Sequence, residues 1–153
     1  MSEPTALGDA RLTQIPHRVV RHGLVGSLEE AAAARGITPD QLIKTMVVRR
    51  GDDDYLFVLV PGDRVISWPK LRATLGVNRL SMPDAVEARE VTGYERGTIT
   101  PLGAVRAWPV IADSRLTGEV SIGAGEHGLS VAVLADDLLE ALSAVSADVT
   151  DPV

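Results

Sequence analysis

Apolar and polar positions along the chain follow two periods, one typical of helices and one typical of strands. A helix is predicted from Ser27, because Ser27 and Glu30 have the spacing of a capping box and Gly36 is placed to end the helix. A brief helical turn is predicted after it, with Thr38 as N-cap and Pro39 at the first helical position. The first third of the chain therefore contains at least two helical segments.

Three further segments predict helices. The stretch "SWPKLRATLG" offers Ser67 as N-cap and Gly76 as the stop signal, and "PDAVEAREVTG" predicts a helix that ends near Gly93. Near the C-terminus, "DDLLEALSAV" predicts a helix capped at Asp136. Helices are therefore expected on both sides of the strand-rich regions.

The strand signals suggest a mixed sheet. "MVVRR" and "YLFVLV" flank the turn-forming "GDDD" and predict a hairpin of residues 46–50 with 55–60, while residues 104–113, 118–125 and 128–135 predict three more strands. Because several strands look hairpin-linked, we expect a single α+β domain with a mixed β-sheet and packed helices rather than a doubly wound parallel sheet. We expect this domain to span residues 15–146, with a flexible N-terminus at 1–14 and a flexible tail at 147–153.

Composition narrows the class of protein. The 153 residues are 45% apolar, contain no cysteine and carry a net charge of −6, which fits one core and excludes disulfides and cysteine chemistry. "MSEPTALGDA" lacks the pattern of a signal peptide, and no apolar run approaches the about 20 residues of a membrane helix, so a soluble cytoplasmic protein is expected, with no membrane and no DNA as partner. Arg11, Arg18 and Arg21 could contact a few phosphates or form a solvated basic face.

The glycine-rich "GAGEHG", residues 123–128, matches the G-x-G-x-x-G pattern of dinucleotide sites. That fingerprint requires a helix after it, whereas "LSVAVL" predicts a strand, so these glycines are interpreted as the backbone of a strand connection that could still line a pocket. His17, His22 and His127 lack the spacing of metal ligands, and no nucleophile elbow is present. Neither a metal nor a cofactor is expected.

Two other features call for a chemical explanation. Lys44 interrupts the apolar "LIKTMVV", so its ammonium either reaches the surface or binds an anionic or carbonyl group in a cleft. The stretch "VTGYERGTITPLG", Val91 to Gly103, holds three glycines and a proline without helical or strand periodicity. Such a segment predicts an unusual backbone.

Read together, "QLIKTMVV", "VTGYERGTITPLG", "PVIAD" and "GAGEHGLSVAV" resemble, in order and spacing, the YbaK/EbsC family of aminoacyl-tRNA deacylases, which is related to the editing domain of bacterial prolyl-tRNA synthetases. The resemblance covers about residues 15–142. It implies an α+β fold with a mixed, bent sheet and hydrolysis of the ester in mischarged tRNA. It also implies that Lys44 anchors the substrate near its terminal adenosine or ester, and that the main chain at Gly97 and Thr98 donates hydrogen bonds to the carbonyl oxygen.

The resemblance also implies a substrate pocket and its specificity. Thr45 after the lysine is similar to the branch that edits cysteine, which favours Cys-tRNA(Pro) or another small amino acid on that tRNA. Gly123 and Ser130 stand where cysteine-editing members often have serine and aspartate, and His22 falls near a position that is often aromatic. The candidate substrate-binding residues are His22, Thr45, Tyr94, Pro101, Gly103, Gly123, Gly125, Gly128 and Ser130.

In that family the reaction looks substrate-assisted, because the tRNA's own ribose hydroxyl, or the thiol of a cysteine substrate, helps the attack. No protein nucleophile is then needed. The acceptor end of an aminoacyl-tRNA is the expected partner, and prolyl-tRNA synthetase is a candidate one. The alternative is a non-catalytic module of the same fold that binds an aminoacyl-tRNA or a synthetase.

Overall fold

The computed structural model describes residues 5–22 and 28–153. Its helices are η1 (Thr5–Gly8), α1 (Ala10–Thr13), α2 (Leu28–Ala34), η2 (Pro39–Gln41), α3 (Trp68–Leu75), α4 (Ala85–Thr92) and α5 (Ala135–Ala141). Its strands are β1 (His17–Arg21), β2 (Ile43–Gly51), β3 (Asp54–Pro61), β4 (Arg64–Ile66), β5 (Val110–Asp113), β6 (Glu119–Gly123), β7 (Leu129–Leu134), β8 (Val145–Ala147) and β9 (Thr150–Pro152). The predicted α+β class is confirmed.

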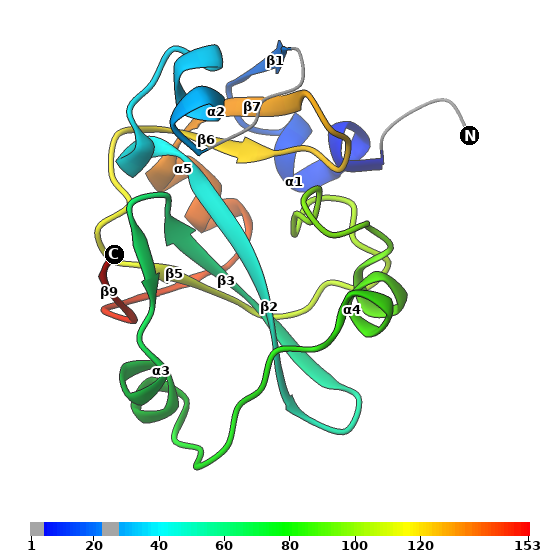
Figure 1. Cartoon of the computed structure of the whole chain (residues 1–153). Helices are drawn as coiled ribbons and strands as arrows, with labels where there is room; N and C mark the ends of the chain where they lie inside the picture. The colour runs from blue at the N-terminus through cyan, green and yellow to red at the C-terminus, as the bar shows by residue number, and fades with distance from the viewer. Residues whose placement is uncertain (1–4, 23–27) are drawn as a thin grey trace.

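The strands form one mixed sheet and two antiparallel ones. The mixed sheet has the order β2-β3-β5-β8, in which β2 and β3 are antiparallel and β3, β5 and β8 run parallel. The antiparallel sheet β1-β7-β6 lies above it in Figure 1, and a parallel bridge between Leu42 and Ser121 connects the two. Strands β4 and β9 form a small third sheet. By hydrogen bonding, the single bent sheet expected from the sequence is thus divided into three.

Strand β3 is buried on both faces, which explains its continuous apolar run. Because side chains alternate along a strand, Tyr55, Phe57 and Leu59 enter a core shared with the β1-β7-β6 sheet. The intervening Leu56 and Val58 enter a second core, which packs beneath α3. Among the named strands β2 pairs only with β3, so it forms the edge of the mixed sheet. Its outer side makes an isolated antiparallel bridge between Arg49 and Ser81.

Most predicted helix boundaries are confirmed. The Ser67 side chain accepts a hydrogen bond from the Lys70 amide at the start of α3, and Gly76 ends this helix in the left-handed conformation. Helix α4 likewise ends at Gly93. The predicted cap at Asp136 is wrong: Leu134 occupies the N-cap of α5, and Asp136 lies in the first turn. The predicted cap at Ser27 lies outside the described residues.

Both ends of the chain differ from the prediction. Within the N-terminal segment expected to be flexible, η1 and α1 place Ala6 and Leu12 in the main core. The expected flexible tail instead contains β9, which pairs with β4 in an antiparallel register. The strand predicted over residues 104–113 begins only at Val110. Among residues 5–22 and 28–153, no helix is long and apolar enough to cross a membrane.

Candidate functional site

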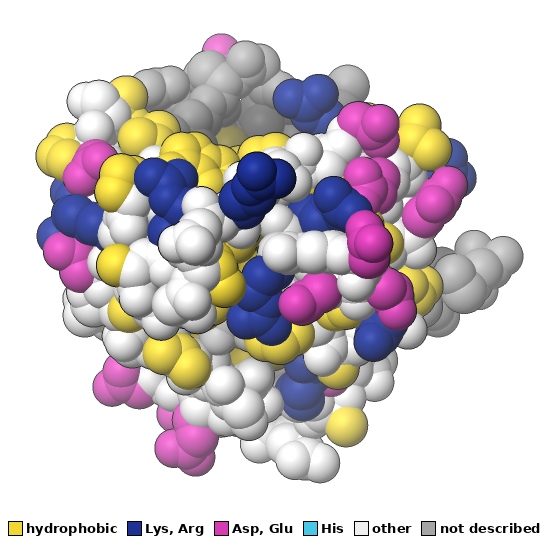
Figure 2. Space-filling view, turned by 90° about the horizontal axis from the view of Figure 1, so that it is seen from below, with side chains coloured by type: hydrophobic (Ala, Val, Ile, Leu, Met, Phe, Trp, Pro, Cys, Tyr) yellow, Lys and Arg dark blue, Asp and Glu magenta, His cyan; other side chains and the backbone are white. Residues whose placement is uncertain are grey.

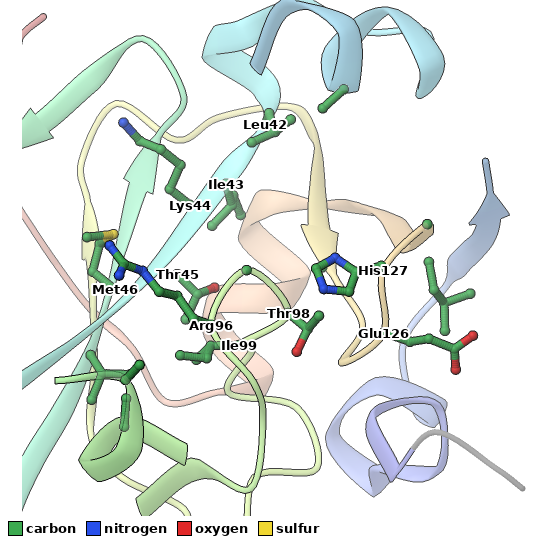
Figure 3. Close-up of a pocket in the computed structure, with 18 of the residues that line it drawn as sticks. Leu42, Ile43, Lys44, Thr45, Met46, Arg96, Thr98, Ile99, Glu126 and His127 are labelled. Carbon is green, nitrogen blue, oxygen red and sulfur yellow. The ribbon is translucent and has the colours of Figure 1, made fainter. Parts of the chain in front are cut away.

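A cavity of about 790 Å³ opens beside the edge strand β2. Its walls come from β2, the start of α4, the loop containing Arg96 to Ile99 and the β6–β7 connection, with Ala31 and Arg35 from the α2 region closing one side (Figure 3). Segments far apart in the sequence therefore meet at one hollow. This is the size range of a cavity that holds a small organic group.

The cavity brings together only some of the residues predicted from the sequence. Seven of them line it: His22, Lys44, Thr45, Gly97, Thr98, Gly123 and Gly128. Five others do not line it: Tyr94, Pro101, Gly103, Gly125 and Ser130. The residues of the second group lie behind the cavity walls, where each is buried or makes a contact that helps to hold a loop of the wall.

Lys44 lies on β2, opposite Val60 of β3. Its ammonium donates a hydrogen bond to the backbone carbonyl of Arg64, and Figure 3 shows its amine end directed away from His127. Burial lowers the pKa of the Lys44 ammonium below its usual value, and the carboxylate of Asp63 partly opposes this shift. A partly desolvated cation therefore stands at one end of the cavity.

Next to it, Thr45 lines the cavity. The Thr45 oxygen is buried and has no hydrogen-bond partner among the residues that the structure describes. The guanidinium of Arg35 donates to the Ser121 hydroxyl at 3.0 Å, and burial lowers the pKa of Arg35. Because a buried polar group without a partner is unfavourable, the Thr45 hydroxyl is a candidate to bind a ligand.

Gly97 forms the wall opposite β2 and has a positive φ of 91°. A Cβ at this position would lie 3.3 Å from Cε1 of His127, so the glycine lets the loop approach the imidazole closely. Within the described part of the chain, the Gly97 amide makes no hydrogen bond. The Thr98 amide differs from the expectation, because it already donates to the carbonyl of Glu95 at 2.9 Å in a turn. One of the two expected backbone donors is therefore available.

Tyr94 and Gly125 support the cavity wall from behind. A Cβ on Gly125 would come within 2.5 Å of the Tyr94 ring, so the two loops pack directly against each other here. The Tyr94 hydroxyl donates to the carbonyl of Leu102 at 2.6 Å. These contacts assign both residues to support of the loops rather than to the cavity surface.

The other end of the Val91–Gly103 loop is held by α1. The Asp9 carboxylate accepts the Gly103 amide at 2.8 Å, and Arg11 donates to the carbonyl of Pro101 at 2.8 Å while pairing with Asp9 at 2.7 Å. Burial alone would raise the pKa of Asp9, but hydrogen bonds from Arg11 and Gly103 outweigh it and lower the pKa to about 2. We call this arrangement of Asp9 and Arg11 the α1 clamp.

Gly128 and Ser130 belong to the frame of the antiparallel sheet. The carbonyl of Gly128 accepts the His22 amide at 2.8 Å, and a Cβ on Gly128 would lie 2.5 Å from the carbonyl oxygen of His22. Ser130 pairs with Gly123 across β6 and β7 and is fully buried. No described residue is within hydrogen-bonding reach of its hydroxyl.

Sequence reasoning missed five polar residues that line the cavity: Arg35, Asp84, Arg96, Glu126 and His127. No role was assigned to His127 from the sequence, because the three histidines lack the spacing of metal ligands, yet His127 lines the cavity. Figure 3 shows its ring beside Thr98, with Lys44 toward the opposite side of the view. Arg96 and His127 each stand among the glycines of the two loops. Their place in glycine-rich loops could have indicated a role, because binding and catalytic residues occur disproportionately on loops.

No group of three or more metal-ligating side chains comes together among the residues described. The model of the aminoacyl-tRNA editing domain matches residues 22–141, a range that includes every described wall of the cavity. The chain belongs to this family. The YbaK/EbsC-type fold expected from the motifs is thereby confirmed.

Individual relatives agree with this assignment. A proline–tRNA ligase of Bacillus licheniformis is 32% identical over 103 residues, which cover 67% of this chain and 18% of the ligase. EbsC of Enterococcus faecalis, provisionally named a Cys-tRNA(Pro)/Cys-tRNA(Cys) deacylase, is 22% identical over 81% of this chain and 77% of its own length. The chain thus spans about a fifth of the ligases that it matches.

The fold also matches a solved structure over its whole length. A protein provisionally described as a trans-editing enzyme for prolyl tRNA synthetase has a TM-score of 0.84 and 24% identity, with 99% of each chain covered. At this level of identity the likeness establishes the fold alone.

Proposed function

We propose that this editing domain is a trans-editing aminoacyl-tRNA deacylase that hydrolyses the ester of mischarged tRNA. The observation that carries the proposal is that Gly97 lines the cavity while its amide makes no hydrogen bond to a described residue, in a chain of the editing family. A backbone donor fixed in this way stabilises the charge that develops on a carbonyl oxygen under attack, an effect worth about 3 to 4 kcal/mol for a well-placed donor.

In the proposed reaction, a water oxygen attacks the ester carbonyl carbon while the Gly97 amide binds the developing oxyanion. The bond from the carbonyl carbon to the ribose oxygen then breaks, and that oxygen leaves as a hydroxyl after taking up a proton. The neighbouring ribose hydroxyl of the substrate orients the water and relays the proton. The aminoacyl group leaves as the free amino acid.

Lys44 is proposed to act on the nucleotide side of the ester. Its ammonium is directed away from His127 and already contacts the Arg64 carbonyl, so it is better placed to bind a ribose or phosphate oxygen than the reacting carbonyl. The fixed cation would hold the terminal nucleotide while the ester lies against Gly97. Positioning of this kind lowers the entropic part of the barrier.

The proposed amino-acid specificity is for a small side chain, cysteine first. The unpartnered hydroxyl of Thr45 supports a hydrogen bond to a polar substrate atom, and the imidazole of His127 narrows the space in front of Gly97. The provisional name of the Enterococcus faecalis relative points to the same substrate class. A panel of tRNA(Pro) charged with cysteine, alanine, serine and proline tests this ranking directly.

The decisive experiment is single-turnover deacylation by Lys44→Ala beside Lys70→Ala. Lys70, the other lysine, pairs with Asp148 at 3.1 Å away from the cavity and is the matched control for loss of a cation. Lys44→Ala should lose most of the deacylation rate while remaining folded, whereas Lys70→Ala should retain it. Equal rates would remove Lys44 from the mechanism, and tight tRNA binding without turnover by the wild type would identify a non-catalytic module instead.

Recognition of RNA is expected to involve few phosphates. The chain carries −6 net charge, and arginines near the β2–β3 turn are already paired, Arg50 with Asp54 at 3.1 Å and Arg106 with Asp53 at 3.2 Å. Figure 2 views this end of the molecule and shows acidic side chains beside the basic ones. Affinity for tRNA should therefore fall only shallowly with salt, and a steep slope in a salt series would reveal a basic face with many phosphate contacts.

A further inference from the structure

A smaller cavity of about 220 Å³ adjoins the first one. The two share Lys44, Met46 and Met82 in their walls, so they meet at the edge of β2. The rest of the smaller wall is apolar and includes the indole of Trp68 and the side chain of Val65. The larger cavity has several charged and polar side chains in its walls, whereas Lys44 is the one polar residue among the described residues that line the smaller cavity.

Alternation along β2 explains why the lysine stands between them. Thr45 projects to the opposite face of the edge strand from its neighbours Lys44 and Met46, and Met46 packs with Trp68 against the core beneath α3. A ligand that begins beside Thr45 and passes over the strand edge therefore reaches Lys44 first and Trp68 next.

The backbone beside Trp68 is fixed by hydrogen bonds of Ser67, whereas the Trp68 side chain makes none to a described residue. Trp68 is the first residue of α3, and Ser67 precedes it. The Ser67 amide donates to the carbonyl of Val149 at 2.8 Å, and the Ser67 hydroxyl accepts a hydrogen bond from the Lys70 amide. The other tryptophan, Trp108, donates its indole N–H to the carbonyl of Val91 at 2.7 Å. The Trp68 indole makes no hydrogen bond to any described residue.

The rim of the smaller cavity is exposed and apolar. Val65 is 45% exposed and Met82 47% exposed, and both lie around the same indole. Scattered exposed apolar side chains are ordinary, but these surround one hollow that continues into the proposed ester site. An apolar pocket with an aromatic wall beside a lysine matches the chemistry of a nucleotide, which has a flat base and an anionic or hydroxylated sugar-phosphate.

We propose that the smaller cavity binds the terminal nucleobase of the aminoacylated RNA, packed against the face of Trp68. This inference rests on the proposed function, which places the ester in the larger cavity and the ribose at Lys44. The base is then the next part of the substrate beyond the lysine. Because the pocket wall beyond Lys44 is apolar, binding depends on stacking and little on the hydrogen-bonding edge of the base.

The kinetic test compares Trp68→Ala with Trp68→Phe on mischarged tRNA. Loss of the stacking face should raise KM about 10-fold or more with kcat little changed, because the interaction is made equally in the ground and transition states. Trp68→Phe should recover most of the affinity. Val145→Ala, which truncates an exposed valine that lines neither cavity, is the matched control and should leave KM unchanged.

The binding test uses adenosine monophosphate and needs no turnover. It should quench tryptophan emission of the wild type saturably and leave that of Trp68→Phe unchanged, since the remaining Trp108 is buried. An unchanged KM in folded Trp68→Ala would overturn the inference even if the wild type is an active deacylase. If the wild type hydrolyses no mischarged tRNA, the proposed function fails, and quenching decides separately whether the pocket binds a base.

Discussion

The two glycine-rich loops that meet at the cavity use glycine for different physical reasons. In the β6–β7 connection, added Cβ atoms at Gly125 and Gly128 would come within 2.5 Å of the Tyr94 ring and the His22 carbonyl oxygen. In the other loop, a Cβ on Gly97 would meet only Cε1 of His127, at 3.3 Å, beside open space. The first loop needs glycine for packing, whereas the second places at the cavity a glycine whose amide makes no hydrogen bond to a described residue.

The loops also differ in what holds them. The β6–β7 connection is fixed by the ladder of its own sheet and by close backbone contact with His22. The Val91–Gly103 loop is held through the α1 clamp and through the Tyr94 hydroxyl on Leu102. A glycine motif therefore does not by itself identify a catalytic loop, because glycines in the two loops meet different contacts.

The largest expected effect is on stability at Gly128. Gly128→Ala places a Cβ against the backbone of His22 and forces an L residue to a φ of 78°, so unfolding free energy should fall by about 3 kcal/mol. Gly118→Ala is the matched control, because its φ of 66° is similar but nothing lies within 4 Å. Urea unfolding measures both. Equal losses would mean that backbone strain alone, and not packing, requires glycine in this loop.

The next effect separates chemistry from folding at Gly97. If its amide binds the oxyanion, Gly97→Ala should lower the single-turnover rate about 100-fold, because the added Cβ and the strained φ misplace the donor. Unfolding free energy should fall by only about 1 to 2 kcal/mol. The matched control is Gly76→Ala. Gly76 ends α3 with a φ of 67° and lies outside the cavity, so this change should cause the same destabilisation with normal turnover. A fully active Gly97→Ala would reduce the loop to scaffold.

Loss of the α1 clamp should have an intermediate effect that depends on pH. The pKa of Asp9 is lowered to about 2, so the clamp stabilises the fold above the unfolded pKa near 3.8 and is lost as pH falls through the folded value. Asp9→Asn should therefore destabilise by about 2 kcal/mol at neutral pH. The difference from wild type should disappear near pH 2, as chemical unfolding at several pH values would show.

The matched control for the clamp is Asp53→Asn. Asp53 is 79% exposed in its pair with Arg106, so this change should be nearly neutral at every pH. A flat difference between Asp9→Asn and the wild type across the pH range would contradict the charge-based clamp.

Local elements could be predicted from the sequence, whereas contacts between distant segments could not. The hairpin and the Ser67 cap follow from neighbouring residues, and both are confirmed. The ends of the chain were predicted wrongly because their partners are remote: Thr150 pairs with Ile66, and Asp9 binds Gly103. Short polar segments such as these look flexible unless their distant partner is known.

The candidate site was predictable to a similar degree. The order of the motifs predicted that Lys44 and Gly97 belong to one site, and both line the same cavity in the structure. Spacing within a loop does not tell which side faces the cavity, so Tyr94 and Gly125 were expected in a pocket that they instead support from behind. For the same reason His127 was missed, although it stands beside the glycines that were singled out.

The smallest expected effect is at Gly123, and it tests whether the β6–β7 connection needs glycine throughout. Gly123 lines the cavity, but its φ is ordinary and no atom lies within 4 Å of an added Cβ. Gly123→Ala should therefore change unfolding free energy by no more than about 0.5 kcal/mol. Because the methyl group enters the cavity, the change should appear instead in substrate preference, with larger aminoacyl groups hydrolysed more slowly relative to small ones. Melting temperature and kcat/KM over the panel of charged tRNAs measure the two effects, and a large loss of stability would show that packing controls this position as it does Gly128.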